Sequence, residues 1–257
     1  MVEELSFEKN SEYEDNIILS CAGICKNFGG MAALKNLDFQ VERGAIFGIA
    51  GPNGAGKTTL FNVISKILPL DQGRVQFDGK YIEKLSAHEV CRYGLTRTFQ
   101  IPQIFKSIPV YKNVLVGTLF GNMQQEGDGI HNNIEEVLNF VGLQEKRDKI
   151  AEELSLFERK ALMIATALAT KPKMLMLDEP VAGLSKIEAN HIMELINKIN
   201  DNNITLILIE HNMDVLMGIS NRVMILHHGE KICEGSPEKV CNDPTVIEAY
   251  LGEKYVS

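Results

Sequence analysis

The sequence predicts an α/β fold with a mainly parallel sheet, an N-terminal antiparallel β-subdomain and a helical insert. Short apolar runs alternate with helix-length segments between residues 158 and 226, which is typical of parallel strands connected by helices. Leu37, Phe39 and Val41 alternate with polar residues, as in an antiparallel strand with one face in water.

The N-terminal part of this fold shows four strand patterns and two helix patterns. Short apolar runs bounded by Gly and Asp predict the strands, with the sequences IILSC, LDFQV, AIFGIAG and RVQFDGKYI. Apolar residues take helical spacing between Thr58 and Leu68. Ser86 and Glu89 have the spacing of a capping box, which predicts a short helix that ends near Tyr93.

Helical patterns dominate after residue 101, and strand patterns return near residue 174. We therefore place a helical insert at about 101–168 in a domain that spans 17–252, after an N-terminal extension of residues 1–16. The elements predicted after residue 157 are helices at 158–169, 187–199 and 213–219 and strands at 174–177, 205–209 and 222–226. Ser-Pro at 236 and Asp-Pro at 243 begin two closing helices, and Gly252 ends the second.

Composition and charge argue against several classes of protein. The 257 residues are 45% hydrophobic and 23% charged, close to the average for globular proteins, so we expect neither disorder nor a coiled coil. A net charge of −8 disfavours nucleic acid as a partner. The longest small and apolar run, Ala161 to Ala169, is far shorter than the roughly 20 residues of a membrane helix.

The ends of the chain and its cysteines indicate a cytoplasmic protein. The acidic N-terminus lacks the basic and apolar regions of a signal peptide. Five cysteines, an odd number scattered among apolar neighbours, fit reduced thiols better than a disulfide framework. Cys21 and Cys25 have no second pair at the spacing of a zinc site.

A glycine-rich loop is the strongest chemical signal. Residues 51–59, GPNGAGKTT, fit the phosphate-loop pattern between a predicted strand and a predicted helix. Backbone amides of such a loop and the dipole of the helix form an anion site. Lys57 adds a charge for the β- and γ-phosphates, and Thr58 adds a hydroxyl ligand for Mg²⁺. A turn that binds nothing is the alternative, which the Lys-Thr pair disfavours. The expected ATP-binding residues are Gly51, Asn53, Gly54, Ala55, Gly56, Lys57, Thr58 and Thr59.

Two adjacent carboxylates end the predicted strand at 174–177. At the carboxyl edge of a parallel sheet they would project toward the nucleotide. Asp178 suits a Mg²⁺ ligand, and Glu179 suits a general base that polarises the attacking water. Two acids in a turn before Pro180 are the alternative reading of the same pattern.

Two further polar residues end predicted strands. His211 follows the strand at 205–209 and can donate a hydrogen bond to a γ-phosphate oxygen, or it can be a structural histidine. Gln100 stands where the insert begins and can bind Mg²⁺ or the attacking water. The other histidines, among them His227 and His228, are expected at surfaces or turns.

In this order, the motifs resemble those of the ATP-binding subunit of ABC transporters, over about residues 17–252. The resemblance implies an ATPase with the ABC ATPase fold, a P-loop NTPase core. It implies that Phe28 stacks on adenine, that Gln100 is the Q-loop residue and that His211 is the switch histidine. GLTRTFQIPQIFKSIPVYKNVLVGTLFG and the C-terminal segment resemble the subunits of branched-chain amino acid importers, with urea-type importers as close relatives.

Two segments depart from the family pattern. The family signature, commonly LSGGQ, is represented by LSLFE, so Leu156 and Phe157 replace glycines that permit close backbone approach. Ser155 keeps the hydroxyl that, in the family, contacts ATP held by the opposing subunit. After the Walker B pair, Ser185 stands where the family usually has an Asp.

The resemblance implies ATP and Mg²⁺ as cofactors and a peripheral place on the cytoplasmic face of the cell membrane. The implied partners are a second ATP-binding subunit, identical or paralogous, integral membrane permease subunits and, indirectly, an extracytoplasmic solute-binding protein. Apolar residues at the entry of the insert, such as Ile101 and Phe105, either dock the permease or pack the insert's own core. A weakly hydrolysing regulatory subunit and a soluble ABC ATPase outside transport are the alternative functions.

Overall fold

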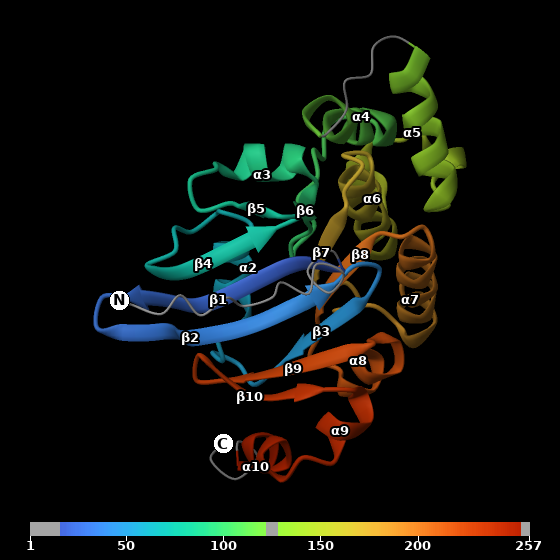
Figure 1. Cartoon of the computed structure of the whole chain (residues 1–257). Helices are drawn as coiled ribbons and strands as arrows, with labels where there is room; N and C mark the ends of the chain where they lie inside the picture. The colour runs from blue at the N-terminus through green and yellow to red at the C-terminus, as the bar shows by residue number, and fades with distance from the viewer. Residues whose placement is uncertain (1–15, 122–127, 253–257) are drawn as a thin grey trace.

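The computed structural model describes residues 16–121 and 128–252, which build two sheets and the helices around them (Figure 1). The smaller sheet is antiparallel and has the strand order β2-β1-β4-β5. Its strands are β1 (Ile17–Phe28), β2 (Met31–Glu42), β4 (Gln72–Phe77) and β5 (Lys80–Tyr81). Leu37, Phe39 and Val41 are buried between exposed neighbours, which confirms the alternation expected of β2.

The larger sheet has the order β10-β9-β3-β8-β7-β6, with parallel pairing everywhere except between β10 and β9. Its strands are β3 (Ile46–Ala50), β6 (Leu95–Arg97), β7 (Met174–Asp178), β8 (Thr205–Ile209), β9 (Arg222–His227) and β10 (Glu230–Gly235). The strands β3, β7 and β8 are buried along their whole length, as strands covered on both faces require. Their carboxyl ends meet at one edge of the sheet.

Helices that belong to the predicted insert lie together at one end of the molecule, at the top of Figure 1. They are α4 (Val110–Phe120), α5 (Asp128–Phe140) and α6 (Leu156–Leu168), with single 3₁₀ turns at Gln144–Lys146 and Ala151–Glu153. The remaining helices are α2 (Lys57–Ile64), α3 (Ala87–Tyr93), α7 (Lys186–Asp201), α8 (Met213–Ile219), α9 (Pro237–Cys241) and α10 (Pro244–Gly252).

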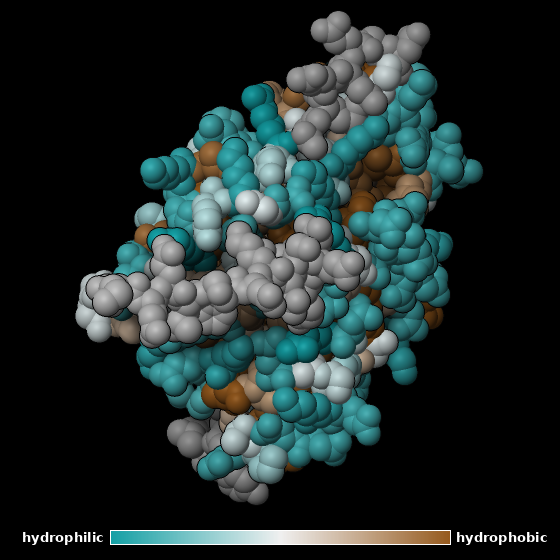
Figure 2. All heavy atoms as spheres, viewed as in Figure 1, coloured by the Kyte–Doolittle hydropathy of each residue, from teal (hydrophilic) through white to brown (hydrophobic). Residues whose placement is uncertain are grey.

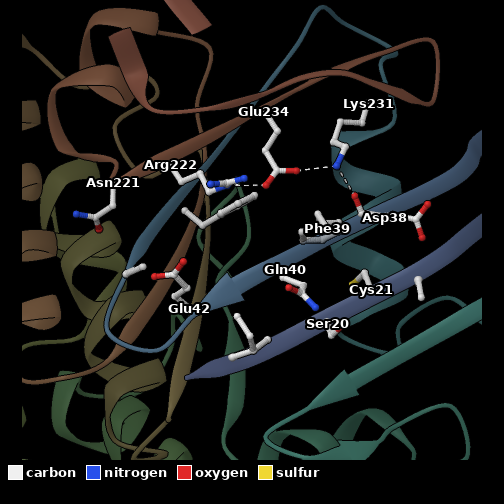
Figure 3. A pocket seen from close by; sticks show the side chains of 14 residues that line it. Ser20, Cys21, Asp38, Phe39, Gln40, Glu42, Asn221, Arg222, Lys231 and Glu234 are labelled. Carbon is white, nitrogen blue, oxygen red and sulfur yellow. Dashed lines mark hydrogen bonds and ion pairs between the residues drawn. The ribbon is translucent and has the colours of Figure 1, made fainter. Parts of the chain in front are cut away.

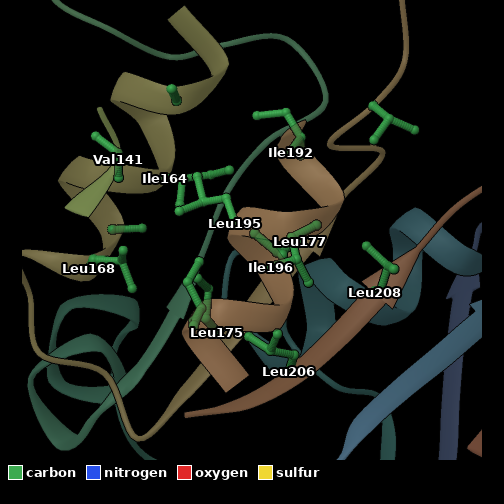
Figure 4. Close-up of a cluster of buried hydrophobic side chains, with 14 of the residues drawn as sticks. Val141, Ile164, Leu168, Leu175, Leu177, Ile192, Leu195, Ile196, Leu206 and Leu208 are labelled. Carbon is green, nitrogen blue, oxygen red and sulfur yellow. The ribbon is translucent and has the colours of Figure 1, made fainter. Parts of the chain in front are cut away.

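Two hydrophobic cores hold these layers together. One lies between the antiparallel sheet, α2 and one face of the larger sheet, and it contains Phe47, Phe61 and Phe77, all fully buried. The other lies between the opposite face of the larger sheet and the helices α4 to α8. Leu175, Leu177, Leu206 and Leu208 project from β7 and β8 toward Ile192, Leu195 and Ile196 of α7 (Figure 4). The larger sheet is therefore packed on both faces, and this packing fixes the strand ends from which the loops at the carboxyl edge begin.

The structure confirms the predicted elements and corrects some of their ends. Helix α2 ends at Ile64 instead of continuing to Leu68, because Lys66 has φ 61° and the Ser65 hydroxyl bonds the Phe61 carbonyl. Helix α6 begins at Leu156, two residues earlier than expected. The N-terminal extension lies outside the described residues except for its last residue, Asn16.

Most of the face shown in Figure 2 is hydrophilic. Hydrophobic residues reach this surface where α5 and α6 lie above α7. Among the residues that the structure describes, none belongs to a helix long and apolar enough to cross a membrane.

Candidate functional site

Five separate segments, among others, converge on one cleft of about 630 Å³. The glycine-rich loop connects β3 to α2, and Phe28 ends β1. Gln100, Glu179 and His211 follow β6, β7 and β8 and line the same cleft. Because these strands are parallel, residues that follow their carboxyl ends meet at one edge of the sheet. The structure thus brings together most of the predicted nucleotide residues, with Asn53 to Thr59 along the wall of the cleft.

The glycine-rich loop has room for glycine alone at two positions. Gly51 has φ 150° and Gly56 has φ 105°, both in the region that side chains disfavour. A Cβ atom on Gly51 would lie 2.1 Å from the backbone oxygen of Leu226, and one on Gly56 would lie 2.7 Å from that of Ala33. The loop is therefore pressed against β9 and β2, and its path is fixed by those contacts.

Lys57 is the first residue of α2 and is buried. Its Nζ donates to the backbone oxygens of Gly51 at 2.5 Å and Pro52 at 2.8 Å. These bonds fold the side chain back over the loop, so the ammonium group lies beside the start of the helix. A positive charge next to free backbone amides at a helix N-terminus is an arrangement that attracts phosphate.

Asp178 ends β7 in a buried ion pair. Its Oδ2 lies 2.8 Å from Nη2 of Arg97, and both side chains are about 5% exposed. Burial raises the pKa of the Asp178 carboxyl above its usual value, and Arg97 acts in the opposite direction. The side chain belongs to the edge of the cleft rather than to its lining residues.

Glu179 is held by both of the other predicted catalytic residues. Gln100 donates from Nε2 to Glu179 Oε2 at 2.6 Å, and Nε2 of His211 lies 2.7 Å from Oε1. Both carboxylate oxygens thus have a partner from a neighbouring strand end. The Glu179 backbone has φ 47°, and the partners of its carboxylate differ from the partner of Asp178.

A buried lysine supports this unusual backbone. Lys160 of α6 is 2% exposed and donates from Nζ to the backbone oxygen of Glu179 at 2.9 Å. Burial lowers the pKa of the Lys160 ammonium, and Glu210 and Glu179 oppose that shift. Burial raises the pKa of the Glu210 carboxyl, whose Oε1 accepts the Val181 amide at 3.1 Å. Helix α6 is thereby tied to the loop that carries Glu179.

Ser155 lies outside the lining of the cleft and begins α6. Its hydroxyl accepts from the Glu158 amide at 3.2 Å, while Glu158 Oε2 accepts from the Ser155 amide at 2.9 Å. Ser185 forms the same capping box with Glu188 at the start of α7. Ser155 and Ser185, which lie in the two segments that differ from the family pattern, are therefore both N-caps of helices in this chain.

The bulky residue after Ser155 contacts the loop that follows β7. Leu156 is 41% exposed, and its Cδ2 lies 3.3 Å from the position that a Cβ atom on Gly183 would take. Leu156 thus lies beside the loop around Gly183, whereas Leu154, two residues before it, is buried. This packing is the local consequence of a leucine where the family pattern has glycine.

Several lining residues were missed by sequence reasoning. His228, placed at a surface turn, lines the nucleotide cleft, as do Met31 and Lys35. His228 has φ 48°, and the Gly229 amide after it bonds the Ala55 oxygen of the glycine-rich loop at 3.0 Å. The sequence pattern HHGE signals the turn, but nothing in it shows that the turn docks on a loop more than 170 positions away.

Three side chains in or beside the cleft carry oxygen atoms of the kind that magnesium binds. Thr58 has an exposed hydroxyl, Gln100 keeps its amide oxygen and Asp178 keeps Oδ1, since their other polar atoms are bonded. Oxygen ligands with few carboxylates suit Mg²⁺ that is shared with phosphates. Within residues 16–121 and 128–252, no group of three or more His, Cys, Asp or Glu side chains could hold a metal ion. A magnesium ion at this site would therefore also need oxygen ligands from the phosphates.

A second cleft, of about 540 Å³, lies between the β1-β2 pair and the β9-β10 hairpin (Figure 3). Three of its charged side chains pair with one another. Glu234 pairs with Arg222 at 2.6 Å and with Lys231 at 2.7 Å, and Lys231 Nζ also donates to the Asp38 backbone oxygen. None of the motif residues lines it, so we assign the chemistry to the first cleft.

Fold and cleft together define a P-loop protein of the nucleotide-hydrolysing class: a glycine-rich loop follows β3, and an acidic pair stands at the same edge of the sheet at the end of β7, with β8 between the two strands. Comparison with known proteins gives the family. The profile described as ABC transporter matches residues 34–182, and that described as branched-chain amino acid ATP-binding cassette transporter matches 230–256. The chain belongs to the ABC transporter family and is an ATPase of that family.

Relatives of similar length support this assignment. The high-affinity branched-chain amino acid transport ATP-binding proteins LivG of Escherichia coli and BraF of Pseudomonas aeruginosa are each 34% identical, over 92% of this chain and 98% of their own. The ADP conformation of MJ1267, an ATP-binding cassette of an ABC transporter, is similar with a TM-score of 0.84 and 34% identity, covering 92% of this chain and 99% of that one. The chain is thus an ATP-binding subunit homologous to those of branched-chain amino acid transporters.

Proposed function

We propose that this chain binds and hydrolyses ATP to power an importer of branched-chain or related amino acids. The observation that carries the proposal is the single cleft in which the glycine-rich loop, Gln100, Glu179 and His211 meet. The amino acid class rests on LivG and BraF, which are named as branched-chain amino acid transport proteins, and on the C-terminal match. An importer of the urea or amide type is the alternative, and that C-terminal match favours amino acids.

In this proposal the residues of the cleft divide the work. Lys57, the loop amides and Thr59 bind the phosphates, and Phe28, which is 45% exposed, offers its ring to adenine. Glu179 takes the proton of the attacking water. Gln100 and His211 orient Glu179, because each is bonded to one of its carboxylate oxygens.

Magnesium would be held by Thr58, Gln100 and Asp178. When bound, it would neutralise charge that develops on the phosphate oxygens. The protein contributes a fixed carboxylate at Asp178 and an exposed hydroxyl at the start of α2.

Hydrolysis in this proposal waits for dimer closure. Gln100 and His211, which this proposal places near the γ-phosphate, are both bonded to Glu179, so we expect the open side of the phosphate to need a further donor. Ser155 of an opposing ATP-binding subunit, identical or paralogous, supplies one. Residues 17–252 act as one ATP-binding domain whose insert, at about 101–168, transmits the closure to the permease.

The permease contact is placed at the entry of the insert. Ile101 is 72% exposed and Phe105 is 57% exposed, whereas Ile104 and Tyr111 pack against the core. Asn113 bonds both the amide and the oxygen of Phe105, at 2.7 and 3.2 Å. Ile104 and Tyr111 therefore belong to the core of the insert, and the proposed contact with the permease is formed by Ile101 and Phe105. The chain would then sit on the cytoplasmic face of the membrane, with an extracytoplasmic binding protein delivering the solute.

A weakly hydrolysing regulatory subunit is the second candidate function. The observation that favours it is Leu156, an exposed side chain beside the loop at Gly183, on backbone where the family pattern has glycine. Closer approach of an opposing phosphate to this backbone is then obstructed.

Glu179→Gln separates these functions. Because a general base contributes about 10²–10⁴ in rate, we expect steady-state ATP hydrolysis to fall at least about a hundredfold. The variant should also form a dimer in Mg-ATP on a sizing column. Glu194→Gln, an exposed substitution on α7, is the matched control and should hydrolyse like wild type. Equal rates for wild type and Glu179→Gln would favour the regulator, and absence of any dimer would refute dimer closure.

The transported solute and the docking surface need their own measurements. Cells that lack this chain should lose leucine uptake and keep urea uptake; the reverse would select the urea-type importer. Phe105→Asp should weaken assembly with the permease and leave ATP affinity unchanged. Equal loss of both would show that Phe105 belongs to the core.

A further inference from the structure

Arg97 is a buried charge at the edge of the nucleotide cleft that the proposed function does not use. It ends β6, and its guanidinium meets Asp178, which ends the neighbouring strand β7. The register pairs Arg97 with Met176, so the two ends lie two residues apart across the parallel ladder. The exposed fractions of the two side chains are 5% and 6%.

The guanidinium is fixed by more than its ion pair. Nη1 donates to Asn62 Oδ1 at 2.5 Å and to Ser65 Oγ at 3.4 Å, both on or next to α2. Its centre lies 5.3 Å from the centroid of the Phe61 ring and 4.9 Å from that of Phe99. A planar fork held between two rings and anchored to a helix has one orientation. Asp178 is thereby connected to the helix whose first residues are Lys57 and Thr58.

Stability alone gives a weak reason for such a pair. Removing two ions from water costs roughly as much as their attraction returns, and apolar side chains of similar volume often serve as well. A buried pair is informative where it fixes geometry, because a loose carboxylate can rotate and present either oxygen. Here one oxygen, Oδ2, is occupied by Arg97, and Oδ1 is left for another partner.

We propose that Arg97 is a positioning residue that holds the Asp178 carboxylate in the orientation in which Oδ1 serves the metal ion. This inference rests on the proposed function, in which Asp178 is a magnesium ligand. The contacts to Asn62, Ser65 and Phe61 set the distance between the carboxylate and the start of α2. Phe99, which is 37% exposed near the entry of the insert, packs on the same guanidinium and extends the connection to that surface.

Binding of Mn²⁺, used as a spectroscopic stand-in for Mg²⁺, tests this role without measuring hydrolysis. The free ion is counted by electron paramagnetic resonance during titration of the full chain with saturating ADP. Loss of an outer partner of a metal ligand typically weakens metal binding 10- to 100-fold. We therefore expect Arg97→Gln to raise the dissociation constant for Mn²⁺ at least about tenfold. The affinity for ADP in excess EDTA should stay within about twofold of wild type.

Three further variants distinguish positioning from charge and from folding. Arg97→Lys keeps the charge and loses the fork, and it should bind Mn²⁺ as weakly as Arg97→Gln. Asn62→Leu leaves both ions in place and removes only the anchor on α2, so it should weaken Mn²⁺ binding about threefold even if the Arg97 variants fail to fold. Arg222→Gln, which breaks an ion pair of similar length in the second cleft, should bind like wild type.

The outcomes separate this inference from the function on which it rests. Wild-type affinity for Mn²⁺ in Asn62→Leu and in folded Arg97→Gln would overturn the positioning role alone. Full recovery in Arg97→Lys would show that charge suffices and would also overturn it. Wild-type protein that binds no Mn²⁺ in the presence of ADP would overturn the proposed function, and the positioning role with it.

Discussion

Ser155 has two roles that one substitution can separate: a helix cap within its own chain and, in the proposed dimer, a donor to the opposing nucleotide. Ser155→Ala removes the hydroxyl that accepts from the Glu158 amide, while the second bond of the capping box, from the Ser155 amide, remains. Loss of one N-cap bond costs about 1 kcal/mol. For a chain of this size that lowers Tm by about 2–4 °C. Asn caps as well as Ser does, so Ser155→Asn should melt within about 1 °C of wild type.

Hydrolysis should respond differently from stability. A hydrogen bond to a charged group is worth about 1.5–3 kcal/mol, so losing the hydroxyl at the opposing γ-phosphate should lower the rate by roughly ten- to a hundredfold. Ser155→Ala should show this loss, whereas the Nδ2 group of Ser155→Asn can still donate. Differential scanning calorimetry and a steady-state ATPase assay on the same preparations give the two readouts.

A matched cap elsewhere serves as the control. The Ser236 hydroxyl accepts from the Lys239 amide at the start of α9, outside the nucleotide cleft. Ser236→Ala should lower Tm by no more than Ser155→Ala and leave hydrolysis intact. A wild-type rate in Ser155→Ala would refute the contact across the dimer, and an unchanged Tm in Ser155→Ala would refute the capping argument.

Three further predictions concern the loop, the buried lysine and acid stability. Gly51→Ala places a Cβ atom 2.1 Å from a β9 carbonyl, so ATP binding by equilibrium dialysis should be lost, and wild-type affinity would show that the loop can shift. Lys160→Met keeps the volume but removes the bond that supports the left-handed backbone of Glu179; hydrolysis should fall at least about tenfold with ATP affinity within twofold, and equal losses would contradict this. The hydrogen bond from Lys26 lowers the pKa of Asp71 below its usual 3.8, so the folded state binds this proton less readily than the unfolded state. The stabilisation is therefore complete above pH 3.8 and is lost as the pH falls through the folded value. Asp71→Asn should show a smaller drop in Tm than wild type between pH 6 and pH 3, and an equal drop would refute the assignment.

The order of the strands and helices was predictable because the periodicity of apolar residues is a local property. The first residues of α6 and α7 were also predictable from the sequence. Ser155 with Glu158 and Ser185 with Glu188 have the same capping-box spacing that identified the helix at Ser86. The early end of α2 was not predictable in this way. It depends on a left-handed residue, Lys66, whose conformation no pattern of apolar residues encodes.

The site was predictable where its residues fall in motifs and unpredictable where they act through distant contacts. Motifs named Gln100, Glu179 and His211, and the structure places them in hydrogen-bond contact. Arg97 appeared in the sequence only as a neighbour of Gln100, because its partner Asp178 lies 81 positions away. Lys160 belongs to no motif, because its burial and its bond to the Glu179 backbone arise only when α6 packs beside the loop after β7.

The two adjacent acids, Asp178 and Glu179, are held by cations from different parts of the fold, so movements of different helices affect them. Arg97 pairs with the side chain of Asp178 and bonds Asn62 of α2, so the position of Asp178 is coupled to the helix that follows the phosphate loop. Lys160 of α6 bonds the backbone oxygen of Glu179, so the position of Glu179 is coupled to the helical insert. Ser155 caps the same helix, and five residues of helix span only about 7.5 Å. A displacement of α6 that brings Ser155 toward an opposing nucleotide therefore also moves the support of Glu179 in its own site, and the two sites of a dimer would be coupled through one rigid helix.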